Sequence, residues 1–580
     1  MLKLFKNLKP YKFGILFIIL LTACQAFTQL YLPKLMSNIV DKGIINGDIN
    51  YILKIGTVMI LVALLGSVAA VFSSLFSSKV AIGFSKDLRK NIFTKVETLS
   101  VGDFNQIGTA SLITRTTNDI NQIQQVLVMM LRMMLMAPIM CAGGIVMALT
   151  TNAKLSTVLL FAAPWVIVSI AIVSKKATPL FKSMQKKLDK LNLVLRENLT
   201  GIRVIRAFNR ISHERIRFNE ANDDLTNTSI KVNKIMAVMI PLMQLILNLT
   251  AVAIIWFGGI RIDQGSMQIG DLMAFIQYTM EIMFSLLLLS MMFVMIPRAS
   301  ASAVRLNEVL EIEPSIKDEY NDKVNTTLRG FVEFKNVSFK YSDSETPVLS
   351  NINFSSNPGE TTAIIGGTGS GKSTLIGLLP RFYDVTDGEI LVSGINIKDI
   401  PQHELRNKIG FVPQKAVLFT GTLSENIKYG KDDATLDEIK HAAEIAQATD
   451  FISEMKDNFE TVIDQGGNNV SGGQKQRLSI ARAIIRKPEI YIFDDSFSAL
   501  DFKTDAKLRA ALKNETVNST VLIVAQRVST VMDADRIIVL DDGIIVGIGT
   551  HKELLKTCDV YKEIVSSQLS KEEIENEYRS

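Results

Sequence analysis

The sequence predicts a chain of two parts, an all-α domain with six membrane-spanning helices and an α/β domain behind it. Two observations support this fold class. Six long apolar runs precede residue 300 and none follows it. From Arg329 the pattern changes to short β-branched and aromatic strands, glycine turns and amphipathic helices, which is typical of an α/β domain. We therefore expect a transmembrane domain over 1–310, a linker over 311–328 and the α/β domain over 329–580.

The composition of the 580 residues agrees with this division and excludes several other classes of protein. Hydrophobic residues make up 48% of the chain and charged residues 21%, which is apolar for a soluble protein of this length. The formal net charge is only +5, so nucleic acid is not expected as a partner. The three cysteines, Cys24, Cys141 and Cys558, have neither the number nor the spacing of a disulfide framework or a metal site.

Each apolar run is long enough for a helix that crosses the hydrocarbon core of a membrane, which needs about 20 residues. Buried helices of a large soluble core are the alternative, but such helices rarely sustain six nearly uncharged stretches of this length. The first run is too long for a cleavable signal peptide and lacks a small-residue cleavage site. The six predicted spans are 13–33, 54–78, 126–150, 154–174, 236–258 and 271–297.

The charges between the spans predict the orientation of the chain. Four lysines precede the first span, which places the N-terminus in the cytoplasm. The segment 175–234 carries fourteen Lys or Arg against six acidic residues, and the segment 79–122 is also long and basic. Both segments are therefore expected on the cytoplasmic side. Six spans return the chain to the cytoplasm, where the α/β domain would lie.

The two cytoplasmic segments keep a helical pattern. Between residues 184 and 202, apolar side chains recur every three or four positions, which is one face of a helix. We expect the spans to continue past the membrane as long rods. Turns at Gly108 and at Thr200–Gly201 would lie at the tips of these rods. Plain solvated helical loops remain an alternative on periodicity alone.

A phosphate-binding loop follows the apolar strand Thr362–Ile365. It matches the pattern G-x-x-x-x-G-K-[ST] between a strand and a helix. Its glycines let backbone N–H groups point at phosphate oxygens, the lysine adds a charge on the outer phosphates, and the serine hydroxyl can ligate Mg²⁺. The loop consists of Gly366, Gly367, Thr368, Gly369, Ser370, Gly371, Lys372, Ser373 and Thr374.

Two further motifs follow the loop. The strand Ile490–Phe493 ends at Asp494, whose carboxylate would reach the edge where a metal should lie; we expect it to hold Mg²⁺ through water. Before this strand, Ser471-Gly-Gly-Gln474 opens a helix. Loop, Ser-Gly-Gly-Gln signature and strand, in this order, resemble the ATP-binding-cassette (ABC) ATPases over essentially all of 329–580. With six spans ahead of it, the chain resembles a half-transporter of the ABC exporter class.

The resemblance implies an α/β P-loop nucleotide-binding domain with a helical subdomain, which takes ATP and Mg²⁺. It implies that Tyr341 stacks on adenine, that Gln414 is the Q-loop residue near the metal, and that Asp501 belongs to the D-loop. Two cassettes of this family face each other head to tail. A second ABC half-transporter is therefore the expected partner, and this chain's signature would cap the partner's ATP. The signature residues are Ser471, Gly472, Gly473 and Gln474.

In addition to Gln414, two other positions are expected to be catalytic. Both depart from the family pattern. In this family the residue after the Walker B aspartate, here Asp494, is normally Glu, but in this chain it is Asp495. The histidine of the family's Ala-His-Arg loop is replaced by Gln526. A carboxylate withdrawn by about 1.5 Å is a poor catalytic contact, and an amide cannot shuttle a proton. We expect a site that binds ATP and hydrolyses it slowly, as in the degenerate subunit of heterodimeric bacterial multidrug ABC exporters. A heterodimer is favoured, and a homodimer stays open.

The sequence indicates less about the transported compound than about the nucleotide site. The third and sixth spans are rich in methionine, which suits a cavity for varied hydrophobic compounds, although lipid-facing or packing methionine is an equal alternative. Glu281 lies near mid-membrane, where it could attract a cationic substrate or bond another helix. Arg132 is expected to snorkel to the membrane surface. The methionines include Met129, Met130, Met133, Met134, Met136, Met283, Met291, Met292 and Met295.

The favoured function is an ATP-driven exporter of amphipathic drugs or lipids. It would lie in a bacterial cytoplasmic membrane, with membrane lipid and a hydrophobic small molecule as its other partners. One alternative is a regulatory subunit whose cassette binds ATP as a fixed brace while its partner does the transport work. Another is a homodimeric lipid flippase. The complete loop, signature and D-loop favour an active participant.

Overall fold

The structure is a computed structural model that describes residues 2–318, 329–342 and 344–570, apart from the side chains of residues 2, 290–295, 297 and 298. The methionines at 291, 292 and 295 therefore lie outside the described side chains. The chain forms two compact units. The helical unit comprises Met1–Glu97 and Gly108–Ile312, and the α/β unit comprises Thr98–Ile107 and Glu313–Ser580. The short segment Thr98–Ile107 thus belongs to the α/β unit, although it lies within the 1–310 of the sequence-based division.

The helical unit contains six helices that are long and apolar enough to cross a membrane, counted within the described residues. This number confirms the six predicted spans. The first of them ends in a π-helical turn, and two π-helical turns interrupt the third. The elements are α1 (Leu2–Phe5), η1 (Lys6–Tyr11), α2 (Lys12–Asn38), η2 (Ile39–Ile44), α3 (Ile49–Glu97), α5 (Thr109–Thr114), η3 (Arg115–Asp119), α6 (Ile120–Met129), η4 (Met130–Met134), α7 (Leu135–Thr151), α8 (Thr157–Thr200), α9 (Ile202–Ala207), α10 (Ile211–Asp263) and α11 (Ile269–Glu311).

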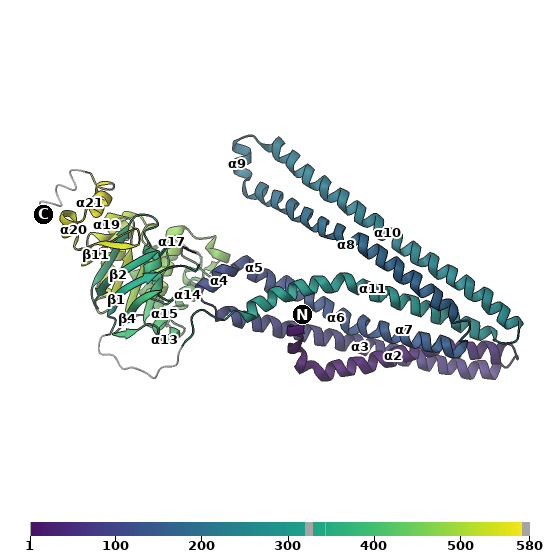
Figure 1. The fold of residues 1–580 in the computed structure, drawn as a ribbon. Helices are drawn as coiled ribbons and strands as arrows, with labels where there is room; N and C mark the ends of the chain where they lie inside the picture. Colours follow the sequence, from purple (N-terminus) through teal and green to yellow (C-terminus); the bar gives the residue numbers. More distant parts are fainter. Residues whose placement is uncertain (1, 319–328, 343, 571–580) are drawn as a thin grey trace. The chain divides into compact units, whose positions relative to one another are not determined.

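Four of these helices are much longer than a membrane is thick. α3, α8, α10 and α11 have 49, 44, 53 and 43 residues, which at 1.5 Å per residue is roughly 65–80 Å. The hydrocarbon core is only about 30 Å thick, so the helices continue as rods, as the periodicity predicts. The α8–α10 hairpin, with α9 at its tip, diverges from the other helices of its unit (Figure 1).

Apolar packing and a few polar ties hold the helical unit together. Ala26 of α2, Met140 of α7 and Phe275 of α11 belong to one buried cluster. Nearer the ends of the rods, Asp119 of η3 is 3% exposed and accepts a hydrogen bond of 2.8 Å from Nε of Arg305 on α11. This ion pair joins the third and sixth long helices outside the apolar spans.

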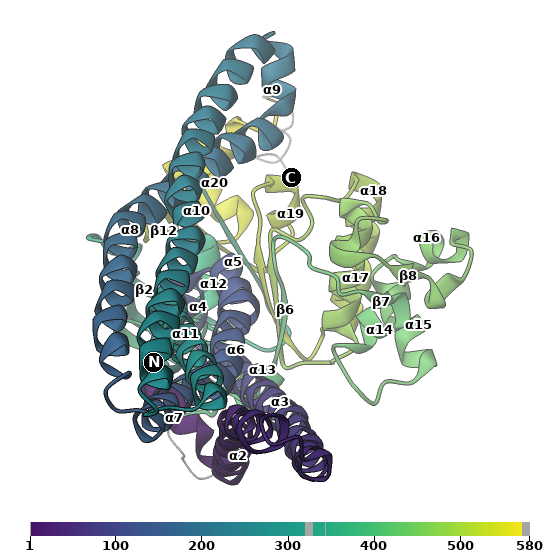
Figure 2. The same cartoon turned by 90° about the vertical axis from the view of Figure 1, so that its right-hand side faces the viewer.

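The α/β unit contains two main sheets. The six-stranded sheet has the order β12-β11-β3-β10-β9-β6, with parallel pairing except for the antiparallel edge strand β12. The four-stranded antiparallel sheet has the order β2-β1-β4-β5. A group of helices around α14–α17 stands beside the large sheet and includes the small β7–β8 ribbon (Figure 2).

The strands of this unit are β1 (Val332–Phe339), β2 (Leu349–Ser356), β3 (Thr361–Gly366), β4 (Asp387–Val392), β5 (Ile395–Asn396), β6 (Ile409–Val412), β7 (Gly421–Thr422), β8 (Val462–Ile463), β9 (Ile490–Asp494), β10 (Thr520–Val524), β11 (Arg536–Asp541) and β12 (Ile544–Gly549). Its helices are α4 (Val101–Ile107), α12 (Lys372–Leu378), α13 (Gln402–Asn407), α14 (Leu423–Lys428), α15 (Leu436–Ile445), α16 (Thr449–Glu454), η5 (Asn458–Glu460), η6 (Gln465–Gly467), α17 (Gly472–Ile484), α18 (Phe502–Glu515), α19 (Val528–Val531), α20 (His551–Thr557) and α21 (Asp559–Ser566).

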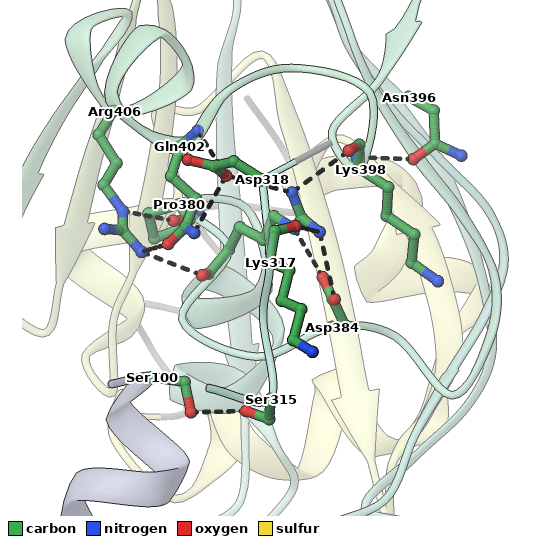
Figure 3. Close-up of polar contacts among 11 residues, drawn as sticks. Ser100, Ser315, Lys317, Asp318, Pro380, Asp384, Asn396, Lys398, Gln402 and Arg406 are labelled. Carbon is green, nitrogen blue, oxygen red and sulfur yellow. Dashed lines mark hydrogen bonds and ion pairs between the residues drawn. The ribbon is translucent and has the colours of Figure 1, made fainter. Parts of the chain in front are cut away.

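The described part of the expected linker docks on the α/β unit through polar contacts (Figure 3). The Ser315 hydroxyl donates to Ser100 Oγ at 2.8 Å, and the Ser315 N–H donates to Asp103 Oδ2 at 3.0 Å. Asp318 Oδ1 accepts from the backbone N–H and the side-chain amide of Gln402 at 3.2 and 3.1 Å. The segment Glu313–Asp318 therefore ties α4 to the rest of the unit.

Candidate functional site

The phosphate loop connects β3 to α12 at the carboxyl end of the large sheet. Residues 362–365 of β3 are buried, so the strand anchors the loop from below. Gly369 and Gly371 have φ of +87° and +96°, a backbone region that favours glycine. A Cβ on Gly366 would lie 2.0 Å from the carbonyl oxygen of Leu540. The glycine pattern thus follows from backbone conformation and from close packing on β11.

Lys372 is held inside this loop. Its Nζ donates to the carbonyl oxygens of Gly366 and Gly367 at 2.9 and 2.6 Å, and the residue is 8% exposed. Burial lowers the pKa of Lys372, an effect that the nearby carboxylates of Asp494 and Asp495 oppose. A phosphate group would supply the negative charge that favours the ammonium form here.

Ser373 and Asp494 lie where a magnesium ion would be expected. The Ser373 hydroxyl donates to Asp494 Oδ1 at 2.9 Å. A hydroxyl from α12 and a carboxylate from β9 are therefore in direct contact. Burial raises the pKa of Asp494; the Ser373 hydrogen bond opposes this, and the negative charge of Asp495 adds to it. Hydroxyl and carboxylate oxygens are the ligands that Mg²⁺ prefers, so the residues present fit the ion.

Asp495 accepts hydrogen bonds that the sequence motifs do not predict. Its Oδ2 accepts hydrogen bonds from the side-chain amides of Gln414, at 3.2 Å, and Gln526, at 2.9 Å. Asp495 is 8% exposed and has φ of +45°, in the left-handed region that costs a non-glycine residue free energy. The three positions singled out as catalytic therefore meet at one carboxylate oxygen.

Gln568 supports this arrangement, and sequence reasoning did not find it. Its Oε1 accepts from the Val528 N–H and its Nε2 donates to the Gln526 carbonyl, both at 2.8 Å. Gln568 thus clamps the turn that carries Gln526. The residue follows α21, far along the chain, and a lone glutamine near the end of a chain carries no motif that could have indicated this role.

Tyr341 lies beside the start of α12. Its hydroxyl shares a 3.0 Å hydrogen bond with Thr374 Oγ1, and its ring packs edge-on against Tyr383 at a centroid distance of 5.3 Å. The aromatic side chain is thus next to the phosphate loop and half-buried. This position suits the adenine contact that the resemblance implies.

The signature residues lie in a different part of the unit. Ser471 is the N-cap of α17, and it exchanges hydrogen bonds with Gln474 through both backbone and side chain. Ser471 and Gly472 are exposed and Gly473 is half-buried. Asp501 caps α18 by accepting from the Thr504 N–H at 2.9 Å. Neither helix start belongs to the lining of the phosphate-loop cavity.

That cavity has a volume of about 260 Å³. It is lined by Val348, Thr368, Gly369, Gly371, Lys372, Ser373, Thr374, Gln414, Asp494, Asp495, Val524 and Gln526. The structure therefore brings together the loop, the Walker B carboxylates and the two glutamines. His551 is not among these residues: it is 5% exposed and its Nδ1 shares a 2.7 Å hydrogen bond with the Tyr561 hydroxyl.

Comparisons with known proteins agree with these features. Residues 15–287 match the family "ABC transporter transmembrane region", and residues 349–498 match the family "ABC transporter". The ABC transporter ATP-binding protein YfiB of Bacillus subtilis is 42% identical over 99% of each chain. The ATP-dependent lipid A-core flippase of Chromobacterium violaceum is 31% identical, with 98% of this chain and 97% of that protein aligned.

One solved structure resembles nearly the whole chain. A bacterial Atm1-family ABC exporter with ATP bound matches with a TM-score of 0.81 and 26% sequence identity, over 97% of this chain and 99% of that chain. Six apolar helices followed by an α/β nucleotide-binding domain are thus the Atm1-type exporter fold. The agreement covers both units of the chain.

Proposed function

Because this chain belongs to the ABC transporters and has a transmembrane region fused to an ATP-binding region, we propose that it is one subunit of an ATP-driven exporter with a slow nucleotide site of its own. The subunit would move amphipathic compounds, drugs or lipids, out across the cytoplasmic membrane by alternating access. Six apolar helices make it a multi-pass membrane protein, and exporters of this kind couple ATP hydrolysis to transport and act as dimers.

In this proposal the phosphate loop binds ATP. Backbone N–H groups of the loop and the N-terminus of α12 would contact phosphate oxygens, and Lys372 would leave the carbonyls of Gly366 and Gly367 for the outer phosphates. Tyr341 would contact the adenine ring. Ser373, Asp494 and Gln414 would hold Mg²⁺, which bridges phosphate oxygens and neutralises their charge when bound.

The observation that carries the proposed slow hydrolysis is the environment of Asp495. A general base must reach the attacking water, and Asp is one methylene shorter than the Glu of the family pattern. In addition, Gln414 and Gln526 both donate to Asp495 Oδ2. These two hydrogen bonds engage one carboxylate oxygen of a side chain that is already withdrawn, so Asp495 is poorly placed to contact the attacking water.

The signature would then serve a second site. Ser471, Gly472 and Gly473 are at the exposed N-terminus of α17, away from this chain's own phosphate loop. A partner's ATP could be capped there, with Asp501 at the same interface. We favour a different half-transporter that carries the intact Glu and His, so that one complete site forms between its phosphate loop and this signature. Two copies of this chain are the simpler assembly if its own site proves active.

The proposed orientation places the N-terminus and the α/β unit in the cytoplasm. The basic segments 79–122 and 175–234 support it. The rod tips would pass closure of the two cassettes to the membrane helices. At the α9 tip, Val204 and Phe208 are 61% and 74% exposed, as expected of apolar side chains that a partner covers.

The decisive experiment is ATP turnover by the purified full-length chain and by three variants: Asp495→Glu, Gln526→His and the double variant. If the site is degenerate, the wild-type chain binds ATP but turns it over slowly, and the double variant gains about 10²-fold in kcat. Nucleotide affinity should change little, because the phosphate loop is untouched.

Robust turnover by the wild-type chain, abolished by Asp495→Asn, would contradict the slow site and support a working homodimer. The flippase of Chromobacterium violaceum makes a homodimeric lipid flippase the second candidate function. A regulatory subunit that holds ATP as a brace is the third, and it predicts that substrate transport by the complex survives when ATP is trapped at this site.

A further inference from the structure

The helical unit contains a cavity of about 570 Å³ between its membrane-spanning helices. Residues of α2, α8, α10 and α11 line it. Most of the lining is apolar and soft, with Met243, Met280 and Phe284 among the side chains. A volume of this size with methionine and aromatic walls accepts a bulky organic molecule.

The cavity also has a polar part with one charge. Gln29 of α2, Gln244 and Asn248 of α10, and Glu281 of α11 line the same space. Gln244 and Asn248 are one helical turn apart, so their amides share a face. Of the described lining residues, Glu281 is the one that carries a charge, and none of them is basic.

Its position along α11 places Glu281 near the middle of the predicted span. It follows the start of α11 at Ile269 by twelve residues, about 18 Å along the helix, near the middle of a hydrocarbon core about 30 Å thick. A carboxylate at this depth costs several kcal/mol unless it faces water or a partner. The residue is partly buried and lines the cavity. Three amides can hydrogen-bond there, but they cannot neutralise its charge.

We propose that this cavity binds amphipathic organic monocations, with Glu281 as the counter-ion and the methionine-rich wall around the apolar part of the ligand. The inference rests on the proposed export function and specifies its substrate class. A cation without a strong hydrogen-bond donor would suffice, because the amides and the carboxylate stabilise positive charge at short range. An anion of the same shape would meet like charge and be rejected.

A second cavity in the same unit provides an internal control. It has a volume of about 550 Å³ and contains Arg132 together with Gln25, Gln124 and Gln125. Arg132 was expected to snorkel, and in the structure its side chain lines this space. The two cavities share the helix α2 and differ in the sign of their charged side chain, so a change at Arg132 should leave cation binding at Glu281 intact.

The test uses the full-length chain in neutral detergent, without nucleotide. Tetraphenylphosphonium and tetraphenylborate are hydrophobic ions of nearly the same size and opposite charge. Equilibrium dialysis, with micelles alone as the blank, measures the binding of each ion to the wild-type chain. The variants are Glu281→Gln, Glu281→Asp and Asn248→Asp, and Arg132→Gln is the matched control.

We expect saturable binding of the phosphonium by the wild-type chain. In Arg132→Gln, which lacks the cation of the second cavity, the borate should bind at least tenfold more weakly than the phosphonium. Glu281→Gln should weaken phosphonium binding about tenfold, the size expected for loss of one charged partner, and Glu281→Asp should retain part of the affinity. Asn248→Asp adds a carboxylate to the same cavity and should tighten binding. Arg132→Gln should leave the phosphonium affinity within twofold of wild type.

Two outcomes overturn the inference. One is equal binding of the two ions by Arg132→Gln, and the other is phosphonium binding by Glu281→Gln within twofold of wild type. If Glu281→Gln does not fold, unchanged affinity in Asn248→Asp decides against the inference in its place. These measurements contain no ATP, so they are independent of the nucleotide site. Binding of the phosphonium without ATP-driven movement into inverted vesicles would leave the cavity assignment standing and contradict the exporter.

Discussion

Asp494 and Asp495 are adjacent carboxyl groups with different surroundings. Asp494 is next to a hydroxyl, and burial raises its pKa. Asp495 accepts from two amides. The nearby Lys372 ammonium offsets part of their charge, but burial still raises the pKa of Asp494. The nucleotide-free site therefore keeps an unfavourable charge at Asp494, which a bound Mg²⁺ ion would compensate.

The pKa of Asp494 predicts how stability depends on pH. Because the folded-state pKa lies above the unfolded value, the protonated carboxyl favours the fold at low pH, and that contribution is lost as pH rises through the folded pKa. At pH 7–8 the nucleotide-free Asp494→Asn variant should thus have a thermal midpoint about 2–4 °C above wild type. The gain should vanish near pH 4. Calorimetry without Mg²⁺ measures both, and Asp399→Asn, at an exposed aspartate of the same unit, is the control.

A lower or unchanged midpoint for Asp494→Asn at pH 8 would mean that the buried charge is already compensated within the chain. The same variant should lose Mg²⁺-dependent ATP binding, because an amide oxygen is a weaker ligand than a carboxylate. The two effects have opposite signs. General damage to the fold would not produce them together.

Hydrogen bonds connect the segment Glu313–Asp318 to the helix α4, and we call the two together the clasp. α4 follows α3 in the chain, and Glu313 follows α11, so the clasp joins the two places where the chain enters the α/β unit. Ser100 and Asp103 exchange hydrogen bonds at 3.1 Å, and Ser315 bonds to both of them. Burial raises the pKa of Asp103, but the hydrogen bonds from Ser315 and Ser100 outweigh it, so its pKa is lowered.

Asp103→Ala should open this clasp. The substitution removes three hydrogen bonds to Asp103 Oδ2, from the Ser100 N–H and from the backbone and hydroxyl of Ser315. At roughly 1 kcal/mol for each net bond, amides of Val101–Ile107 should exchange hydrogen at least tenfold faster. Hydrogen–deuterium exchange followed by mass spectrometry measures this, and ATP affinity should not change.

The stabilising contribution of Asp103 to the clasp depends on pH with the opposite sign to that of Asp494. Because the pKa of Asp103 is depressed, its stabilising contribution is present above the unfolded value of about 3.9 and is lost as pH falls through the lower folded pKa. The clasp should therefore stay closed from pH 5 to pH 8. Exchange rates in Val101–Ile107 that rise between pH 7 and pH 5, after correction for intrinsic exchange, would contradict this account.

The α8–α10 hairpin has an exposed apolar tip that a second subunit could cover. Its tip exposes apolar side chains, and the hairpin stands away from the other helices of its unit (Figure 1). The signature helix α17 also begins at an exposed position. Exporters of this kind act as dimers, and both features are what a second subunit would cover.

Phe208→Ser tests the role of the tip. The side chain is 74% exposed in the single chain, and a buried aromatic anchor at an interface contributes about 2 kcal/mol or more. In the assembled dimer, transport-coupled ATP turnover should fall at least tenfold while ATP binding stays within twofold. Phe208→Tyr keeps the ring and should remain active. Full coupling in Phe208→Ser would exclude an anchoring role for this residue.

The fold class, the six spans, the long rods and the phosphate loop could be predicted from the sequence alone. These features are local: an apolar run, a helical period and a glycine pattern each depend on neighbours along the chain. The departures at Asp495 and Gln526 were visible for the same reason, because each lies at a fixed offset within a motif.

Which of these groups contact one another depends on the tertiary structure. Asp495 bonds to glutamines that are 81 and 31 residues away, and Gln568 clamps the second of them without any motif of its own. Thr98–Ile107 joined the α/β unit because hydrogen bonds to Ser315 hold it there, although its sequence continues a helical pattern. Glu281 shares a cavity with Gln29 and Asn248 from two other helices. Such contacts depend on how elements pack in three dimensions, and spacing along one chain does not encode that packing directly.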